Sequence, residues 1–234
     1  MTMGDLDNTS SERIFYFDID NCLYSPDLGI HHLTRARIYA FGKDIGMDSA
    51  SVVDTCSSYY KDYGLTVRGL INHHGIDVAE FNKKVDGDLP LESVIKPDPA
   101  LRQMILSIKT RRWAFTNAGI DHARRVLKCL QVDDLFEGIT YCDYTEPDFP
   151  CKPERRAYEK PERRAYEKVM EESGVKDSQL CYFADDSVSN VKTAKEIGWT
   201  TVLVSKLPPS TSATTDFHIT TIHELPKVLP QLFM

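Results

Sequence analysis

The sequence lacks the cysteine pattern of a metal-binding or disulfide-stapled protein. Its six cysteines are scattered over 234 residues, and none of them forms a C-x-x-C pair. This arrangement fits neither a zinc site nor a disulfide framework. It predicts reduced thiols, and therefore a cytoplasmic protein or one that is also nuclear.

Long apolar runs and an excess of positive charge are missing as well. No stretch is long enough to span a membrane, and the polar residues 1–12 contain no run typical of a signal peptide. The chain has 28 Lys and Arg against 35 Asp and Glu, a formal net charge of −7. This balance argues against a nucleic-acid backbone as the main partner. We therefore expect neither a membrane nor nucleic acid as a partner, and the oligomeric state stays open.

From residue 98 onward, short apolar runs alternate with amphipathic segments. We expect strands at 113–117, 138–142, 180–184, 200–204 and 217–219, and helices that include 99–108, 120–130, 161–173 and 188–197. Ile14–Phe17 supplies a further strand near the N-terminus. Such alternation predicts an α/β fold, a Rossmann-like parallel sheet with helices on both faces.

The first strand and residue 98 are separated by a region with helical periodicity. We expect one helix that ends near Gly46, a second over 49–62 and a third after Gly75, with a loop over 59–70 because two glycines lie there among aromatics. The apolar face of the first helix would carry Ile30, Leu33, Ile38, Phe41 and Ile45. The predicted organisation is a flexible N-terminus at 1–12, a core domain formed by 13–25 and 98–234, and an all-helical cap domain at 26–97.

Polar residues follow several of the predicted strands directly. Asp18 and Asp20 follow the first strand, Thr116 and Asn117 end the second, and Asp185 with Asp186 follow the strand at 180–184. The carboxyl ends of parallel strands share one edge of the sheet, where open α/β folds bind their ligands. Each signal alone is typical of a solvated turn or a helix N-cap. Together they predict one site with carboxylates, hydroxyl and amide groups.

A lysine completes this set, but a tandem repeat makes its identity ambiguous. The eight residues 152–159 recur without change as 160–167, so Lys152 and Lys160 are both candidates. Lys160 lies 25 residues before Asp185, and an apolar helix face follows it directly in the sequence. Lys152 would require a helix about 12 Å longer, at 1.5 Å per residue. The spacing therefore favours Lys160.

These motifs resemble those of the haloacid dehalogenase (HAD) superfamily, in the same order along the chain. The resemblance rests on Asp18-Ile19-Asp20, Thr116-Asn117, the lysine and Asp185-Asp186. The segments 17–24, 60–70 and 185–187 are similar to the pyrimidine 5′-nucleotidase branch, which includes the fungal family of the suppressor of disruption of TFIIS. The resemblance implies a HAD core with a cap inserted after the first strand, and a phosphatase.

The resemblance also implies roles for individual residues. Asp18 would be the nucleophile, Asp20 the general acid and base, and Lys160 the cation that offsets charge in the transition state. Asp20 would have to hold a proton while Asp18 stays ionised, so their pKa values would be separated. Thr116 and Asn117 would bind the phosphoryl oxygens.

The cofactor implied by the resemblance is Mg²⁺, which prefers oxygen ligands. The expected ligands are Asp18, Asp20 through its backbone carbonyl, Asp185 and Asp186. Asn190, one helical turn after Ser187, would face the same acidic pair. In the insert, Arg68 is the candidate for contact with the substrate, since a guanidinium suits phosphate or a base carbonyl.

The resulting hypothesis is Mg²⁺-dependent hydrolysis of pyrimidine nucleoside 5′-monophosphates such as UMP and CMP. Another phosphomonoester, a sugar phosphate or a lysophospholipid, remains an alternative because caps determine specificity. A catalytically impaired binding or regulatory module on the same fold is a second alternative. Haloacid dehalogenation is disfavoured because it needs neither a metal nor the second aspartate, Asp20.

Overall fold

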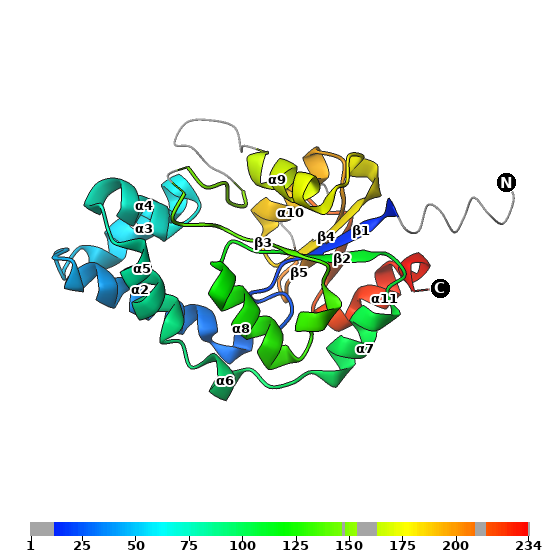
Figure 1. Ribbon diagram of the computed structural model, residues 1–234, viewed down its shortest axis with the longest axis horizontal. Helices are drawn as coiled ribbons and strands as arrows, with labels where there is room; N and C mark the ends of the chain where they lie inside the picture. The colour runs from blue at the N-terminus through cyan, green and yellow to red at the C-terminus, as the bar shows by residue number, and fades with distance from the viewer. Residues whose placement is uncertain (1–11, 147, 154–162, 209–213, 234) are drawn as a thin grey trace, which may run out of the picture.

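A six-stranded parallel sheet forms the centre of the protein. The computed structural model describes residues 12–146, 148–153, 163–208 and 214–233. Within these ranges the strand order is β3-β2-β1-β4-β5-β6, and all neighbouring strands run parallel. The predicted Rossmann-like α/β fold is therefore confirmed (Figure 1). The strands are β1 (Ile14–Phe17), β2 (Arg111–Phe115), β3 (Ile139–Thr140), β4 (Cys181–Asp185), β5 (Thr200–Val204) and β6 (Phe217–Ile219).

Strand β1 occupies the middle of the sheet and is buried along its whole length. Alternate side chains point to opposite faces. Phe15 and Phe17 accordingly join one hydrophobic cluster, while Ile14 and Tyr16 join another. A four-residue apolar run can hold this central position because both faces of the sheet are covered.

Helices cover the two faces of the sheet. The face of Phe15 and Phe17 packs against α7 (Pro99–Ser107), α8 (Ile120–Leu130) and α11 (Leu225–Val228). The opposite face packs against α9 (Arg164–Ser173) and α10 (Val188–Glu196). Helix α7 begins where the sequence predicts, because the Asp98 side chain accepts a hydrogen bond from the Leu101 backbone N–H at 2.8 Å.

The region between β1 and β2 is helical throughout; the structure describes all of residues 18–110 and has no strand there. The elements that precede α7 in this region are η1 (Pro26–Leu28), α2 (Ile30–Asp44), α3 (Val52–Tyr63), α4 (Thr66–His74), α5 (Val78–Phe81), the π-helical η2 (Asn82–Gly87) and α6 (Leu91–Val94). Figure 1 shows α2 to α5 gathered to one side of the sheet. We refer to residues 26–97 as the insert. Residues 1–11 of the predicted flexible N-terminus lie outside the described residues.

Two expectations for the insert were wrong. Leu33 is 40 % exposed, and the residues that α2 buries are Ile30, Phe41 and Gly42. Residues 59–70 are mostly helical, because α3 continues to Tyr63 and α4 starts at Thr66. Gly64, with φ of 77°, ends α3, whereas Gly69 lies inside α4. A Cβ on Gly69 would approach Cγ of Tyr59 to 2.2 Å, so this glycine marks close helix packing and not a loop.

Candidate functional site

Three carboxylates meet at the carboxyl edge of the sheet. β1 and β4 are neighbours with Phe17 opposite Ala184, and the Asp18 backbone N–H donates to the Ala184 carbonyl at 2.9 Å. This pairing brings Asp18 beside Asp185. Asp18, Asp185 and Asp186 each offer an oxygen atom within 4.8 Å of the others. Both Asp18 and Asp185 are buried, at 7 % and 0 % exposed.

Lys152 lies between two of these carboxylates. Its Nζ donates to Oδ1 of Asp18 and to Oδ2 of Asp185, both at 2.8 Å, and the residue is 1 % exposed. Burial acts to lower the pKa of Lys152, but the two carboxylates raise it above the ordinary lysine value. The two carboxylates therefore favour the charged form of the lysine.

The contacts of Lys152 with Asp18 and Asp185 support this lysine as the cation of the site. Lys160, which the sequence favours, lies outside the described residues. The argument for Lys160 assumed that the lysine begins the helix that leads to β4. In the structure α9 begins at Arg164, and Lys152 belongs to a separate segment before it. A lysine in this segment reaches the site without any lengthening of α9.

Asn117 fixes the backbone of Lys152. The Asn117 Oδ1 accepts a hydrogen bond from the Lys152 N–H at 2.7 Å, and its Nδ2 donates to the Lys152 carbonyl. Thr116, at the end of β2, is 2 % exposed, and its Oγ1 accepts a hydrogen bond from the Ala118 N–H at 3.0 Å. The Asn117 side chain therefore positions the lysine, a role that the sequence did not predict.

The second motif carboxylate, Asp20, faces different partners. Its Oδ1 accepts a hydrogen bond from the Tyr24 hydroxyl at 2.6 Å and lies 2.8 Å from Nε2 of His122. His122 is 5 % exposed and lies in the first turn of α8. Sequence analysis missed His122. The available signal was its position six residues after Thr116, on the helix face that also buries Val126.

The pKa values of the two motif aspartates depart from their ordinary values in opposite directions. Burial raises the pKa of Asp18 well above its ordinary value, and Lys152 opposes this only in part. Burial also acts to raise the pKa of Asp20, but the charge and hydrogen bond of His122 outweigh it, and this pKa is lowered. Burial acts to lower the pKa of His122, but the charge and the hydrogen bond of Asp20 outweigh burial and raise this pKa to about 9. Both shifts oppose the expected order, in which Asp20 is protonated and Asp18 ionised: burial raises the pKa of Asp18, and His122 lowers the pKa of Asp20.

The acidic cluster fits a small divalent cation. Burial and the neighbouring Asp185 raise the pKa of Asp186 to about 7, which is the effect of like charges held close together. Carboxylate oxygens are the ligands that Mg²⁺ prefers. Asp185 is oriented by Asn190, whose Nδ2 lies 2.9 and 3.0 Å from its two oxygens, and by the Ser187 N–H at 2.8 Å. The Asp20 carboxylate faces His122 and Tyr24, so its backbone carbonyl is its remaining candidate ligand atom.

Arg68 connects the insert to the segment that precedes Lys152. The residue is 8 % exposed, its guanidinium lies 4.5 Å from the centre of the Phe149 ring, and its Nη2 donates to the Phe149 carbonyl. These contacts give Arg68 a structural role between α4 and the segment before Lys152. Substrate contact by Arg68 stays a prediction.

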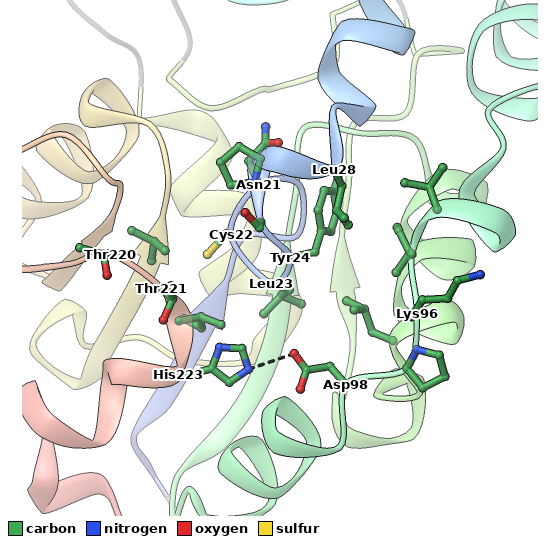
Figure 2. Close-up of a pocket in the computed structure, with 18 of the residues that line it drawn as sticks. Asn21, Cys22, Leu23, Tyr24, Leu28, Lys96, Asp98, Thr220, Thr221 and His223 are labelled. Carbon is green, nitrogen blue, oxygen red and sulfur yellow. Dashed lines mark hydrogen bonds and ion pairs between the residues drawn. The ribbon is translucent and has the colours of Figure 1, made fainter.

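A cavity of about 360 Å³ lies beside the site, between the two chain segments that join the insert to the sheet domain (Figure 2). Its walls come from residues 21–26, 28, 94–99 and 220–223, among others. One wall contains the pair of His223 Nε2 and Asp98 Oδ2, 2.9 Å apart. Tyr24 lines this cavity and also binds Asp20, whereas the acidic cluster does not line it.

No helix among the described residues is long and apolar enough to cross a membrane.

The chain is similar to a curated yeast protein. The chain is 35 % identical over 204 residues to Phosphate metabolism protein 8 of Saccharomyces cerevisiae. That match covers 82 % of this chain and 61 % of the yeast protein, so the chain spans about three fifths of the length of this curated relative.

Solved structures share the fold. The HAD phosphatase of Thermococcus onnurineus superposes with a TM-score of 0.58 at 20 % identity, covering 95 % of this chain and 100 % of that one. The HAD hydrolase YfnB of Bacillus subtilis, bound to magnesium, superposes with a TM-score of 0.60 at 15 % identity, covering 94 % and 99 %. Residues 12–198 match the sequence model of a family described as haloacid dehalogenase-like hydrolases. Since this match extends over most of the chain, the protein belongs to the haloacid dehalogenase-like hydrolase family.

Proposed function

We propose that this protein is a Mg²⁺-dependent phosphomonoesterase. The observation that carries the proposal is a buried carboxylate, Asp18, held by Lys152 next to Asp185 and Asp186, with a second carboxylate, Asp20, bound to separate donors. Phosphoryl transfer needs a positioned nucleophile, cations around the developing charge and an acid for the leaving oxygen. This arrangement supplies each of them.

The proposed reaction has two steps, both centred on Asp18. A carboxylate oxygen of Asp18 attacks the phosphorus while the bond to the leaving oxygen breaks, and Asp20 delivers the proton to that oxygen. An aspartyl-phosphate results. Water then attacks the phosphorus, Asp20 removes its proton, and the bond between phosphorus and Asp18 breaks. The products are an alcohol and inorganic phosphate.

The remaining residues would orient the phosphoryl group and balance its charge. Mg²⁺, held by Asp18, Asp185 and Asp186, would neutralise phosphate charge and keep Asp18 ionised in spite of its burial. Lys152 would stabilise charge that develops on the phosphoryl oxygens. Thr116 and the backbone N–H of Asn117 would bind the same oxygens.

His122 would hold the proton that the leaving oxygen requires. Its pKa of about 9 keeps the imidazole protonated near neutral pH, while its Nε2 is hydrogen-bonded to Asp20. The proton can therefore pass from the pair of His122 and Asp20 to the leaving oxygen. This arrangement allows Asp20 to serve as the acid although its own pKa is lowered.

For the substrate we propose pyrimidine nucleoside 5′-monophosphates, UMP and CMP. The support is the similarity of residues 17–24, 60–70 and 185–187 to the pyrimidine 5′-nucleotidase branch. We further propose that 26–97 act as the cap domain over a core formed by 13–25 and 98–234. A sugar phosphate or a lysophospholipid is the alternative substrate, and an impaired regulatory module on this fold is the alternative function.

A panel assay tests the proposal directly. Phosphate release is measured from UMP, CMP, AMP, glucose 6-phosphate and a lysophosphatidic acid, each with Mg²⁺ and with EDTA. We expect UMP and CMP to be hydrolysed fastest, with loss of activity in EDTA and in Asp18→Asn. Equal rates for AMP would refute the pyrimidine specificity. Activity that survives Asp18→Asn would refute the mechanism.

A further inference from the structure

The second ring nitrogen of His122 has no partner. Nε2 is bound to Asp20, whereas Nδ1 is buried and has no hydrogen bond within the part of the chain that the structure describes. His122 itself is 5 % exposed. A buried donor without an acceptor costs about 1–3 kcal/mol. An acceptor that reaches Nδ1 would remove this cost.

The insert supplies a carboxylate, Asp86, that is near enough to His122 for each charge to affect the pKa of the other group. Asp86 is on the π-helical η2, and among the described residues its carboxylate has no hydrogen bond or ion pair. Its charge nevertheless acts on three groups of the sheet domain, namely His122, Asp20 and Tyr144. Burial raises the pKa of Asp86. Among the described residues, the insert thus brings an acceptor without a hydrogen bond close to a buried donor of α8 that also has none.

Arg125 holds η2 next to His122. Its guanidinium donates to the backbone carbonyls of Asp86 at 2.8 Å, Gly87 at 3.1 Å and Leu89 at 2.8 Å. It also donates twice to the Glu92 carboxylate, at 2.9 Å each. His122 and Arg125 are three residues apart on α8 and therefore lie on the same face of the helix. The backbone of Asp86 is thus fastened beside His122.

We propose that Asp86 is a positioning residue, and that its carboxylate accepts a hydrogen bond from Nδ1 of His122 when the insert closes on the sheet edge. The chain Asp86–His122–Asp20 then fixes the Asp20 carboxylate toward the leaving oxygen. Closure of the insert would then position the general acid Asp20 at the same time, so that a conformational step is linked to the chemical step. The inference rests on the proposed phosphomonoesterase function, in which Asp20 serves the leaving group.

A double-mutant cycle tests the chain of contacts. Asp86→Ala, His122→Ala and the double variant are assayed with UMP, or with the best alkyl phosphate of the panel, and with p-nitrophenyl phosphate. Nitrophenolate leaves without protonation, so it needs little help from Asp20. We expect Asp86→Ala to lower kcat on the alkyl phosphate at least about tenfold and on p-nitrophenyl phosphate less than about threefold. In the His122→Ala background, the same change should cost less than about twofold.

Two further variants control for structural effects. Asp88→Ala removes a carboxylate two residues away that is 61 % exposed, and it should leave both rates within about twofold. Asp86→Asn keeps an acceptor oxygen and should recover part of the lost rate. Full additivity of the Asp86 and His122 effects would overturn the proposal, because it would place Asp86 on the substrate. An unchanged rate in Asp86→Ala would overturn it as well.

A spectroscopic measurement separates this inference from the proposed function. With Mg²⁺ and orthovanadate, the His122 imidazole should show an exchange-protected Nδ1–H proton by NMR. That signal should be lost in Asp86→Ala and kept in Asp88→Ala. A wild-type protein that hydrolyses no phosphomonoester refutes the function, whereas the absence of an Asp86-dependent signal refutes the contact.

Discussion

The side chain of Lys152 is buried between Asp18 and Asp185, with its Nζ 2.8 Å from an oxygen of each. The backbone N–H and carbonyl of Lys152 are both hydrogen-bonded to the Asn117 side chain. The geometry explains why this lysine can stay charged inside the protein. Two carboxylates replace the water that burial removes, as a buried cation requires. The same contacts tie Asp18, the proposed nucleophile, to Asp185 of the proposed metal-binding pair through one side chain.

We predict that Lys152→Ala lowers kcat/KM at least about 100-fold, because an electrostatic contact to the transition state is lost. The protein should also lose about 3–5 kcal/mol of stability, since Asp18 and Asp185 remain buried without a counter-charge. Phosphate release and urea unfolding measure the two effects. Lys160→Ala is the matched control and should change kcat/KM less than about twofold. A reversed result would assign the role to Lys160.

At the scale of elements, α3 and α4 form a close pair in the insert. Tyr59 of α3 packs onto the backbone of α4 at Gly69, and its hydroxyl lies 3.0 Å from Nε2 of His74. The Tyr59 ring also stacks on His73 at 5.0 Å between centroids. Gly69 thus sets the separation of the two helices, and through them the placement of Arg68 on Phe149.

We predict that Gly69→Ala destabilises the protein by about 1–3 kcal/mol, because a Cβ there has no room against Tyr59. The gain in helix propensity from alanine offsets only part of this cost. Asn72→Ala, at an exposed position of the same helix, should change the free energy of unfolding by less than about 0.5 kcal/mol. Urea unfolding curves compare the two variants. Equal stability of Gly69→Ala and wild type would contradict the packing.

At the scale of the whole molecule, ligand binding at the sheet edge should stabilise the entire fold. The acidic cluster exists only when β1 and β4 are paired, so a cation bound there favours the folded state. The cluster draws on Asp18 after β1 and on Asp185 with Asp186 at the end of β4. These segments are more than 160 residues apart in the chain.

We predict that Mg²⁺ at 100 times its Kd stabilises the folded protein by about 2.7 kcal/mol. For a chain of this size the melting temperature should rise by roughly 5–10 °C. Differential scanning calorimetry with Mg²⁺ and with EDTA measures the shift without any substrate. Asp185→Asn should abolish it, and Asp88→Asn should retain it. The absence of a shift in the wild type would contradict a metal site at this cluster.

The local sequence determined the elements of the sheet domain and the polar residues at the strand ends. Apolar runs such as Ile14–Phe17 and caps such as Asp98 act on their own neighbours in the chain, so the elements they form can be predicted without knowledge of the tertiary structure. The HAD motifs were readable for the same reason, since each is a short run at the end of one strand.

Only the tertiary structure decided which lysine meets Asp18, what holds Asp20, and that Gly69 lies inside a helix. Lys152 and His122 act on residues more than 100 positions away in the sequence, and Tyr59 packs against a different helix. Such contacts depend on how strands pair and helices pack, and no local spacing encodes them. The spacing favoured Lys160 on the assumption that the lysine begins the helix before β4. In the structure this helix, α9, begins at Arg164, and Lys152 reaches the site from residues that precede it.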